Sequence, residues 1–196
     1  MLFRSGLQHV GVSSFLRILL MQALAQIKQG NRLQINCQQT RIETTHRILN
    51  GDLNEHGTLF GGRLLETVDA EASVAAMRVA RATLVTAAMD HVQFVKPFHL
   101  QDAMIVRAVV TGLGHRSVEV FVKVLGEHLM TGERFVGFTC FLTYVVPGAE
   151  SGLAYDELIA DNDETKYLLA GYQDRRAQRA TVRQQERDLL AHLSCE

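Results

Sequence analysis

One acidic residue interrupts the apolar stripe of the longest helical pattern in the sequence. Asp69 follows Leu65 by four residues and precedes Ala72 and Ala76 by three and seven, so the four share one helix face. Burying a carboxylate there costs roughly several kcal/mol unless something compensates. The residues leave two interpretations open: an acid at the helix flank that reaches solvent or pairs with an arginine, or a carboxylate in a partly dry site suited to activating water.

The turn before this helix offers a second chemical group. Gly61 and Gly62 open the helix, where the first backbone N–H groups have no intrahelical partner and stabilise negative charge. A carbonyl group held there would develop an oxyanion against those N–H groups during attack by a nucleophile. The same glycines also fit a plain tight turn. No Gly-Lys-Ser/Thr follows them, so the pattern does not indicate a phosphate loop.

Other nucleophiles and metal ligands lack a supporting pattern. Cys37, Cys140 and Cys195 are far apart, and no pair has the spacing of a zinc site. We therefore expect free thiols in a reducing, cytoplasmic compartment. The histidines are scattered, and neither a metal nor a redox cofactor is expected.

The elements that must position Asp69 follow from hydrophobic periodicity. A first strand is expected at residues 39–49, then a glycine turn and a helix of about five turns ending near Val79. The period then changes to two, which predicts strands at 85–95, 103–111, 117–126 and 135–146. Short connections let the last three strands pair as antiparallel hairpins. The predicted fold is α+β, with a long central helix wrapped by a curled five-stranded antiparallel sheet.

The chain divides into three parts. Residues 1–36 are expected to be a helical or poorly ordered extension, residues 37–146 the core domain, and residues 147–196 a loop followed by one charged C-terminal helix. The apolar run at 15–27 is interrupted by Arg17 and too short to span a membrane, with an organelle-targeting peptide as the minor alternative. A net charge of −1 argues against a nucleic-acid partner.

Four stretches of the core resemble the acyl-CoA thioester hydrolases of the hotdog superfamily. They read N-E-H-G-T-L-F-G-G-R-L-L-E-T-V-D at 54–69, V-T-A-A-M-D-H-V-Q-F-V-K-P at 85–97, R-S-V-E-V-F-V-K-V at 116–124 and T-G-E-R-F-V-G-F-T-C-F-L-T-Y-V at 131–145. The resemblance implies a hotdog fold, hydrolysis of acyl-CoA to fatty acid and CoA, and a homodimer that assembles into a hexamer as a trimer of dimers. The sequence departs from the family pattern at Ala70, where a second acid is common, and at Ala88, where Ser is common.

The resemblance also implies roles for individual residues at an interface between protomers. Asp69 would act as general base or as nucleophile, and the position matching Thr58 often contributes a polar group from the partner chain. The expected catalytic set is Asp69, Thr58, Gly62 and Asn54. The expected CoA-binding set is Gly61, His56, Lys96, His115, Arg116 and Ser117, whose cations would meet the phosphates.

Two further functions remain as alternatives. A non-enzymatic acyl-CoA-binding or sensor module can occupy the same fold, but it has no need of an acid at Asp69. A dehydratase on this fold would normally want an Asp/His pair in its own motif.

Overall fold

A computed structural model describes residues 33–148 and 152–195 of the chain. From Gln34 onward the described residues form one compact unit, which is described below. The predictions for residues 1–32, namely an extension that is helical or poorly ordered, lie outside the described residues. In the part of the chain that is described, no helix is both long enough and apolar enough to cross a membrane.

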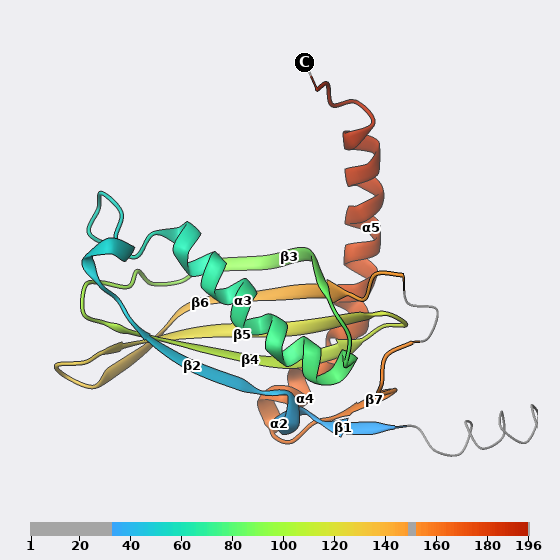
Figure 1. Cartoon of the computed structure of the whole chain (residues 1–196), viewed down its shortest axis with the longest axis horizontal. Coiled ribbons are helices and arrows are strands. Elements are labelled where there is room, and N and C mark those ends of the chain that lie inside the picture. The colour runs from blue at the N-terminus through green and yellow to red at the C-terminus, as the bar shows by residue number, and fades with distance from the viewer. Residues whose placement is uncertain (1–32, 149–151, 196) are drawn as a thin grey trace, which may run out of the picture. The chain divides into compact units, whose positions relative to one another are not determined.

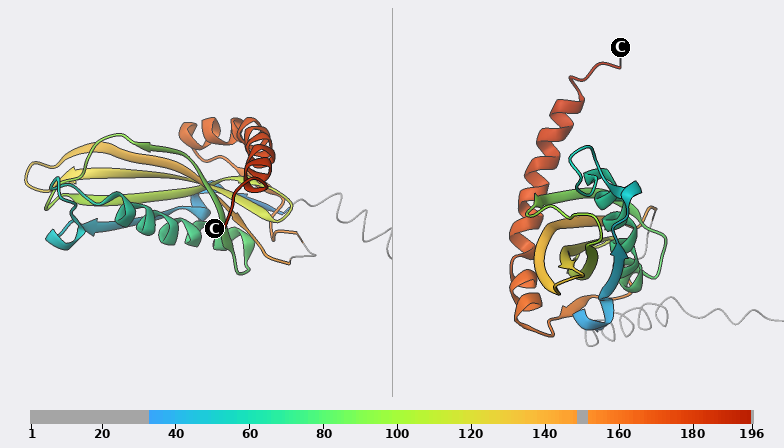
Figure 2. Two further views of the ribbon diagram at one scale, coloured as in Figure 1. Left: turned by 90° about the horizontal axis from the view of Figure 1, so that it is seen from above. Right: turned by 90° about the vertical axis from the view of Figure 1, so that its left-hand side faces the viewer.

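A long helix lies in the hollow of a curled antiparallel sheet (Figures 1 and 2). The elements are β2 (Ile42–Arg47), the 3₁₀ turn η1 (Asn50–Asp52), α3 (Gly61–Ala80), β3 (Val85–Phe94), β4 (Ala103–Leu113), β5 (Ser117–His128) and β6 (Glu133–Val145). The five strands follow the order β2-β4-β5-β6-β3, which leaves β2 and β3 at the two edges. The predicted α+β architecture, with its central helix and five-stranded sheet, is confirmed; the sheet is curled but open.

Small and branched side chains explain how closely α3 approaches the sheet. The buried face of α3 is Ala-rich, and the inner face of β5 presents a row of valines. The buried residues are Leu64, Val68, Ala72, Ala75, Ala76, Val79 and Ala80 on α3, and Val118, Val120, Val122 and Val124 on β5. Alanine adds no bulk between helix and sheet, and β-branched valines pack well on a pleated surface. The helix that bears Asp69 is therefore fixed by packing.

The first strand is shorter than predicted. Residues 37–40 form a short helix, α2 (Cys37–Thr40), and the strand begins only at Ile42. Asn36 caps this helix: its Oδ1 accepts the Gln38 N–H at 2.8 Å, while its own N–H donates to the Gln39 side chain at 3.0 Å. This reciprocal cap outweighs the partial alternation that suggested a strand from residue 39.

The segments on either side of the predicted core also contain structure that the pattern missed. Gln34–Asn36 forms β1, which pairs in parallel with β7 (Glu157–Ile159) from the predicted loop. The C-terminal region is two helices, α4 (Asp163–Ala170) and α5 (Tyr172–Leu190), and not one. The two helices meet at Gly171. The next residue, Tyr172, packs against Gly112 of the sheet, where a side chain larger than hydrogen would not fit.

Candidate active site

Asp69 is held in a defined position near the middle of α3. Its carboxylate is half-buried, and its Oδ1 accepts a hydrogen bond of 2.8 Å from the Thr86 hydroxyl on β3. No described residue donates a hydrogen bond to Oδ2. The interpretation of Asp69 as an acid that reaches solvent or pairs with an arginine does not fit. Among the described residues Asp69 makes no ion pair with an arginine, and its side chain is not fully exposed. One oxygen is thus anchored, and the other is available to a reacting group.

Tyr144 on β6 secures the helix at the same point. Its hydroxyl donates to the backbone carbonyl of Asp69 at 2.8 Å and lies 3.4 Å from Oδ1. Burial, together with the negative charge of Asp69, raises the pKa of Tyr144 well above its ordinary value. The hydroxyl therefore keeps its proton and remains a donor, so α3 is pinned to the sheet at the acid itself.

The N-terminus of α3 is open to a ligand. Phe60 occupies the cap position and supplies no side-chain hydrogen bond. The first intrahelical bond runs from the Leu64 N–H to the Phe60 carbonyl at 3.1 Å, so the N–H groups of Gly61 and Gly62 have no partner in the helix. These are the donors that an oxyanion would require.

The turn that leads into α3 is held by a single amide side chain. Asn54 Oδ1 accepts the N–H groups of His56 at 3.0 Å and Thr58 at 3.1 Å, and its Nδ2 lies 3.0 Å from the Thr58 hydroxyl. The Leu59 N–H in turn donates to the Phe98 carbonyl at 2.9 Å. In this arrangement Asn54 shapes the turn and orients Thr58.

Four of the site residues that were predicted from the sequence line one pocket of about 330 Å³. Its lining includes Asn54, Thr58, Gly61 and Lys96, with an apolar wall from Leu64, Phe94, Val95 and Phe98. The Lys96 ammonium lies 5.6 Å from the centre of the Phe135 ring. The pocket combines helix N–H groups, a hydroxyl, a cation and apolar surface.

Other predicted site residues lie elsewhere in the protomer. Gly62 lines a separate hollow with Phe60 and Arg63. His56 is exposed beside Glu55. His115 and Arg116 lie in the turn between β4 and β5, and Ser117 lines a pocket of about 190 Å³ under α5.

Asp69 is also distant from the helix N-terminus of its own chain. Eight residues separate it from Gly61, and a rise of 1.5 Å per residue places the two about 12 Å apart along the axis. One carbonyl cannot contact both. Within one chain, the acid with Thr86 and the pocket with Thr58 are therefore two separate groups of candidate residues.

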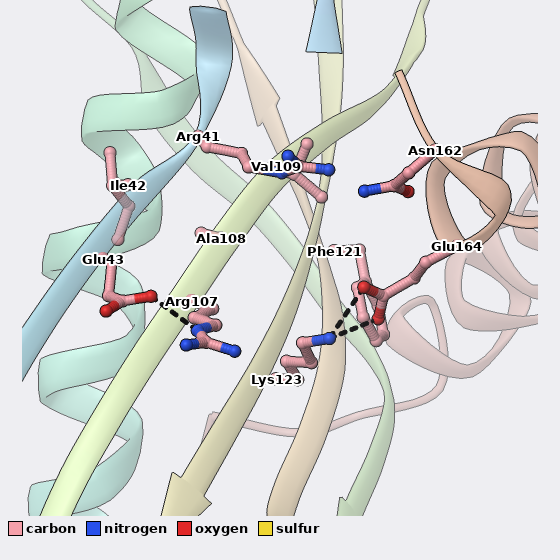
Figure 3. A pocket seen from close by; sticks show the side chains of 10 residues that line it. All are labelled: Arg41, Ile42, Glu43, Arg107, Ala108, Val109, Phe121, Lys123, Asn162 and Glu164. Carbon is pink, nitrogen blue, oxygen red and sulfur yellow. Dashed lines mark hydrogen bonds and ion pairs between the residues drawn. The ribbon is translucent and has the colours of Figure 1, made fainter. Parts of the chain in front are cut away.

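A different pocket, on the outer face of the sheet, has more charged side chains than the pocket beside Thr58, but its cations are paired with carboxylates (Figure 3). Its volume is about 390 Å³, and its cations are Arg41, Arg107 and Lys123. Arg107 lies 2.6 Å from Glu43, Lys123 lies 2.5 Å from Glu164, and Arg41 pairs with Asp161 at 2.6 Å. Because each cation has a carboxylate partner, this pocket offers no unpaired charge to an anionic ligand.

Sequence reasoning missed Thr86 and Tyr144 as members of the site. Both lie within stretches that carry the family resemblance, but alternation in a strand does not distinguish a hydroxyl that meets a helix from one that meets water. Only the pairing of β3 with β6, which sets Thr86 opposite Tyr144, brings both beside Asp69. In the described ranges 33–148 and 152–195, no cluster of three or more metal-ligating side chains is found.

Comparison with known proteins gives the chain its relatives. Residues 56–133 match the thioesterase superfamily. The chain is 47% identical over 109 residues to an uncharacterized acyl-CoA thioester hydrolase of Bacillus subtilis (strain 168); the alignment covers 56% of this chain and 63% of the relative, less than two thirds of its length.

Two solved structures extend the match in space. An acyl-CoA hydrolase from Bacillus cereus superposes with a TM-score of 0.77 at 32% identity and covers 83% of this chain and 99% of its own. A hexameric acyl-CoA thioesterase in its apo form superposes with a TM-score of 0.67 at 30% identity, over 83% and 99% of the two chains. The central helix in a curled sheet, the acid on that helix and these matches agree: the chain belongs to the hotdog-fold thioesterase superfamily.

Proposed function

We propose that the protein hydrolyses acyl-CoA thioesters to a free fatty acid and CoA. The observation that carries the proposal is the half-buried carboxylate of Asp69, whose Oδ1 is fixed by Thr86 and whose Oδ2 has no donor among the residues that the structure describes. An acid held in this way is suited to take a proton from water or to attack a carbonyl directly. The B. subtilis and B. cereus relatives, named as acyl-CoA hydrolases, support the same chemistry.

The active site is completed by a second copy of the chain. Asp69 of one protomer faces the pocket of its partner, where the Gly61 N–H group at the start of α3 receives the oxyanion and Thr58 helps to orient water. The separation of about 12 Å between Asp69 and Gly61 within one chain supports this arrangement. So does β3, an edge strand with mostly exposed side chains, because an unpaired edge favours pairing with another strand. The assembly is a homodimer, and a trimer of dimers by analogy with the hexameric relative.

The CoA moiety binds along the mouth of the pocket. Lys96 meets a phosphate of the nucleotide, and the apolar wall beside Phe94 and Phe98 receives the thioester arm or the acyl chain. His115, Arg116 and Ser117 come near this ligand only from another protomer, because they lie at the far end of the sheet. The free state of Cys37, Cys140 and Cys195 supports work in the reducing cytoplasm.

Hydrolysis of a series from acetyl-CoA to palmitoyl-CoA tests the proposal. Asp69→Asn keeps the size and the hydrogen bond from Thr86 but removes the base, so turnover should fall at least about a hundredfold. Glu71→Gln is the matched control: it removes a carboxylate two residues further along the same helix, one that lies 3.4 Å from His46 instead. The control should hydrolyse the best substrate at the wild-type rate.

Binding separates an enzyme from a sensor. Asp69→Asn should still bind CoA in calorimetry and melt within a few degrees of the wild type. A wild-type protein that binds acyl-CoA but releases no thiol across the series would instead be a binding module. A folded Asp69→Asn variant with normal turnover would remove Asp69 from the mechanism.

A further inference from the structure

The first half of α5 is fixed to the outer face of the sheet, opposite α3. Tyr172 fills the space left by Gly112 on β4. The buried carboxylate of Glu119 on β5 accepts hydrogen bonds from Arg175 at 2.8 Å and Arg179 at 2.5 Å. Arg179 also lies 3.4 Å from Asp90 on β3. These contacts run from β4 across the sheet to its edge.

The second half of α5 has no such contacts. Every residue from 180 to 190 is exposed, and three of them are large and apolar: Val182 is 47% exposed, Leu189 59% and Leu190 65%. Leu193, just after the helix, is 59% exposed. Val182 and Leu189 are seven residues apart on α5, so they share one stripe of the helix, and Leu193 follows the end of the helix. A stripe of this kind on a soluble surface marks a contact.

The length of the helix shows where this stripe lies. At 1.5 Å per residue, the eleven residues from 180 to 190 extend about 16 Å beyond the point where Arg179 meets β3. Neighbouring strands are about 4.8 Å apart, so this length carries the helix past β3, whose outer side it still borders at Val182, Arg183 and Glu186. The right-hand view of Figure 2 shows α5 continuing past β3, where this protomer has no sheet beneath it.

The surface under the helix continues toward the open edge. A pocket of about 190 Å³ lies between β3 and α5, and its lining includes Ala88 and Met89 from the edge strand and Val182 from the start of the stripe. A sheet extended from β3 would therefore pass directly beneath the overhanging half. The apolar stripe and the strand edge form one continuous surface.

We propose that residues 181–193 form an assembly arm that docks on the outer face of the sheet of a second copy of this chain. The inference rests on the two-copy assembly in the proposed function. Pairing through β3 places the partner's sheet under the arm, and two-fold symmetry makes the exchange reciprocal. Because α5 and Asp69 lie on opposite faces of the sheet, the arm stabilises the assembly without contacting the reacting atoms.

The test is the mass of the full-length protein against concentration, measured by light scattering. Leu189→Arg places a charge on the stripe, and Gln184→Arg places the same charge on another face of the same exposed helix. Leu189→Arg should raise the concentration for half-assembly at least about tenfold, while Gln184→Arg should leave it unchanged. A chain ending after Ala180 retains Tyr172, Arg175 and Arg179 and should match or exceed the effect of Leu189→Arg.

Three outcomes would contradict the proposal that residues 181–193 form an assembly arm. They are normal assembly of Leu189→Arg, normal assembly of the shortened chain, and an equal loss for Leu189→Arg and Gln184→Arg. Normal assembly of all variants would show that the stripe does not contact a second copy of this chain. That result would not contradict the proposed two-copy active site. A wild-type protein that is monomeric and fully active would refute that active site itself. Turnover per assembled protein should be the same for the wild type, Leu189→Arg and Gln184→Arg, since neither position lines the pocket of Asn54, Thr58 and Gly61 or contacts Asp69.

Discussion

The two long helices, α3 and α5, have nearly the same length but are attached to the sheet in different ways. α3 has seven buried residues, all apolar and mostly alanine, and lies in the hollow of the sheet. α5 has one buried residue, Tyr172, and is otherwise held by arginines that reach one buried glutamate. Packing over a whole face fixes α3 along its length, whereas ion pairs fix α5 at one place.

This difference suits the two roles that we assign to the helices. A catalytic carboxylate must be held within a fraction of an ångström, and a packed helix with Tyr144 and Thr86 at the acid meets that need. An assembly arm needs a firm base and a free outer half. The contrast leads to three predictions, in order of decreasing effect.

Glu119→Gln should release α5 and leave α3 in place. It removes the charge that two guanidinium groups share in a buried site, where breaking an ion pair costs about 3–5 kcal/mol. Hydrogen exchange should accelerate throughout α5 and remain slow in α3. The matched control is Glu127→Gln on the same strand, whose partner Arg134 is mostly exposed, and it should cost less than about 1 kcal/mol. Equal exchange rates in α5 of the variant and the wild type would show that packing, not charge, holds this helix.

Ala72→Leu should destabilise the protein by about 2 kcal/mol in denaturant unfolding, because the extra carbons have no space between α3 and the sheet. Ala177→Leu makes the same change on the exposed surface of α5 and should shift stability by no more than about 0.5 kcal/mol. Equal effects at the two positions would contradict the contrast between a packed and a peripheral helix.

The same contrast explains which features could be predicted from the sequence. The spacing of apolar residues along the chain indicates which face of an element is buried. For this reason α3 and the strands from β3 to β6 were predicted close to their observed limits. The attachment of α5 depends on Glu119. This residue lies in the alternating pattern of β5, and nothing in the neighbouring sequence indicates which residues it pairs with. Its arginines come from more than fifty residues away. The break at Gly171 likewise depends on the fit of Tyr172 against Gly112, a contact between distant residues.

The site shows the same limit. Asp69 stood out because a charge on an apolar helical stripe is a local anomaly. Thr86 and Tyr144 are ordinary strand residues by type, and only strand pairing places them beside the acid. Lys96 and Thr58 share a pocket because the chain returns past the helix N-terminus after β3. Local pattern therefore singled out the candidate acid, and long-range pairing supplied the groups that hold it.

The smallest of the three effects compares thiols in the two regions. Cys140 lies on β6 in the core under α3, and Cys195 is exposed after α5. Burial, and to a lesser degree the charge of Asp90, raises the pKa of Cys140 from 9.0 to about 12. A thiol reagent at pH 8 should therefore modify Cys195 rapidly in the folded protein and Cys140 only after unfolding.

The raised pKa also predicts how stability depends on pH. Below pH 9 the Cys140 thiol is neutral in both the folded and the unfolded chain and does not contribute to the dependence. Between pH 9 and 12 the unfolded chain loses this proton while the folded chain keeps it, so stability falls as the pH rises, by about 1 kcal/mol at pH 10. Cys140→Ala should unfold more easily at pH 7 but lose less stability than the wild type between pH 7 and 10. A Cys140→Ala variant with the wild-type pH dependence would show that the thiol ionises as readily in the folded core as in the unfolded chain, and that α3 does not keep water from β6.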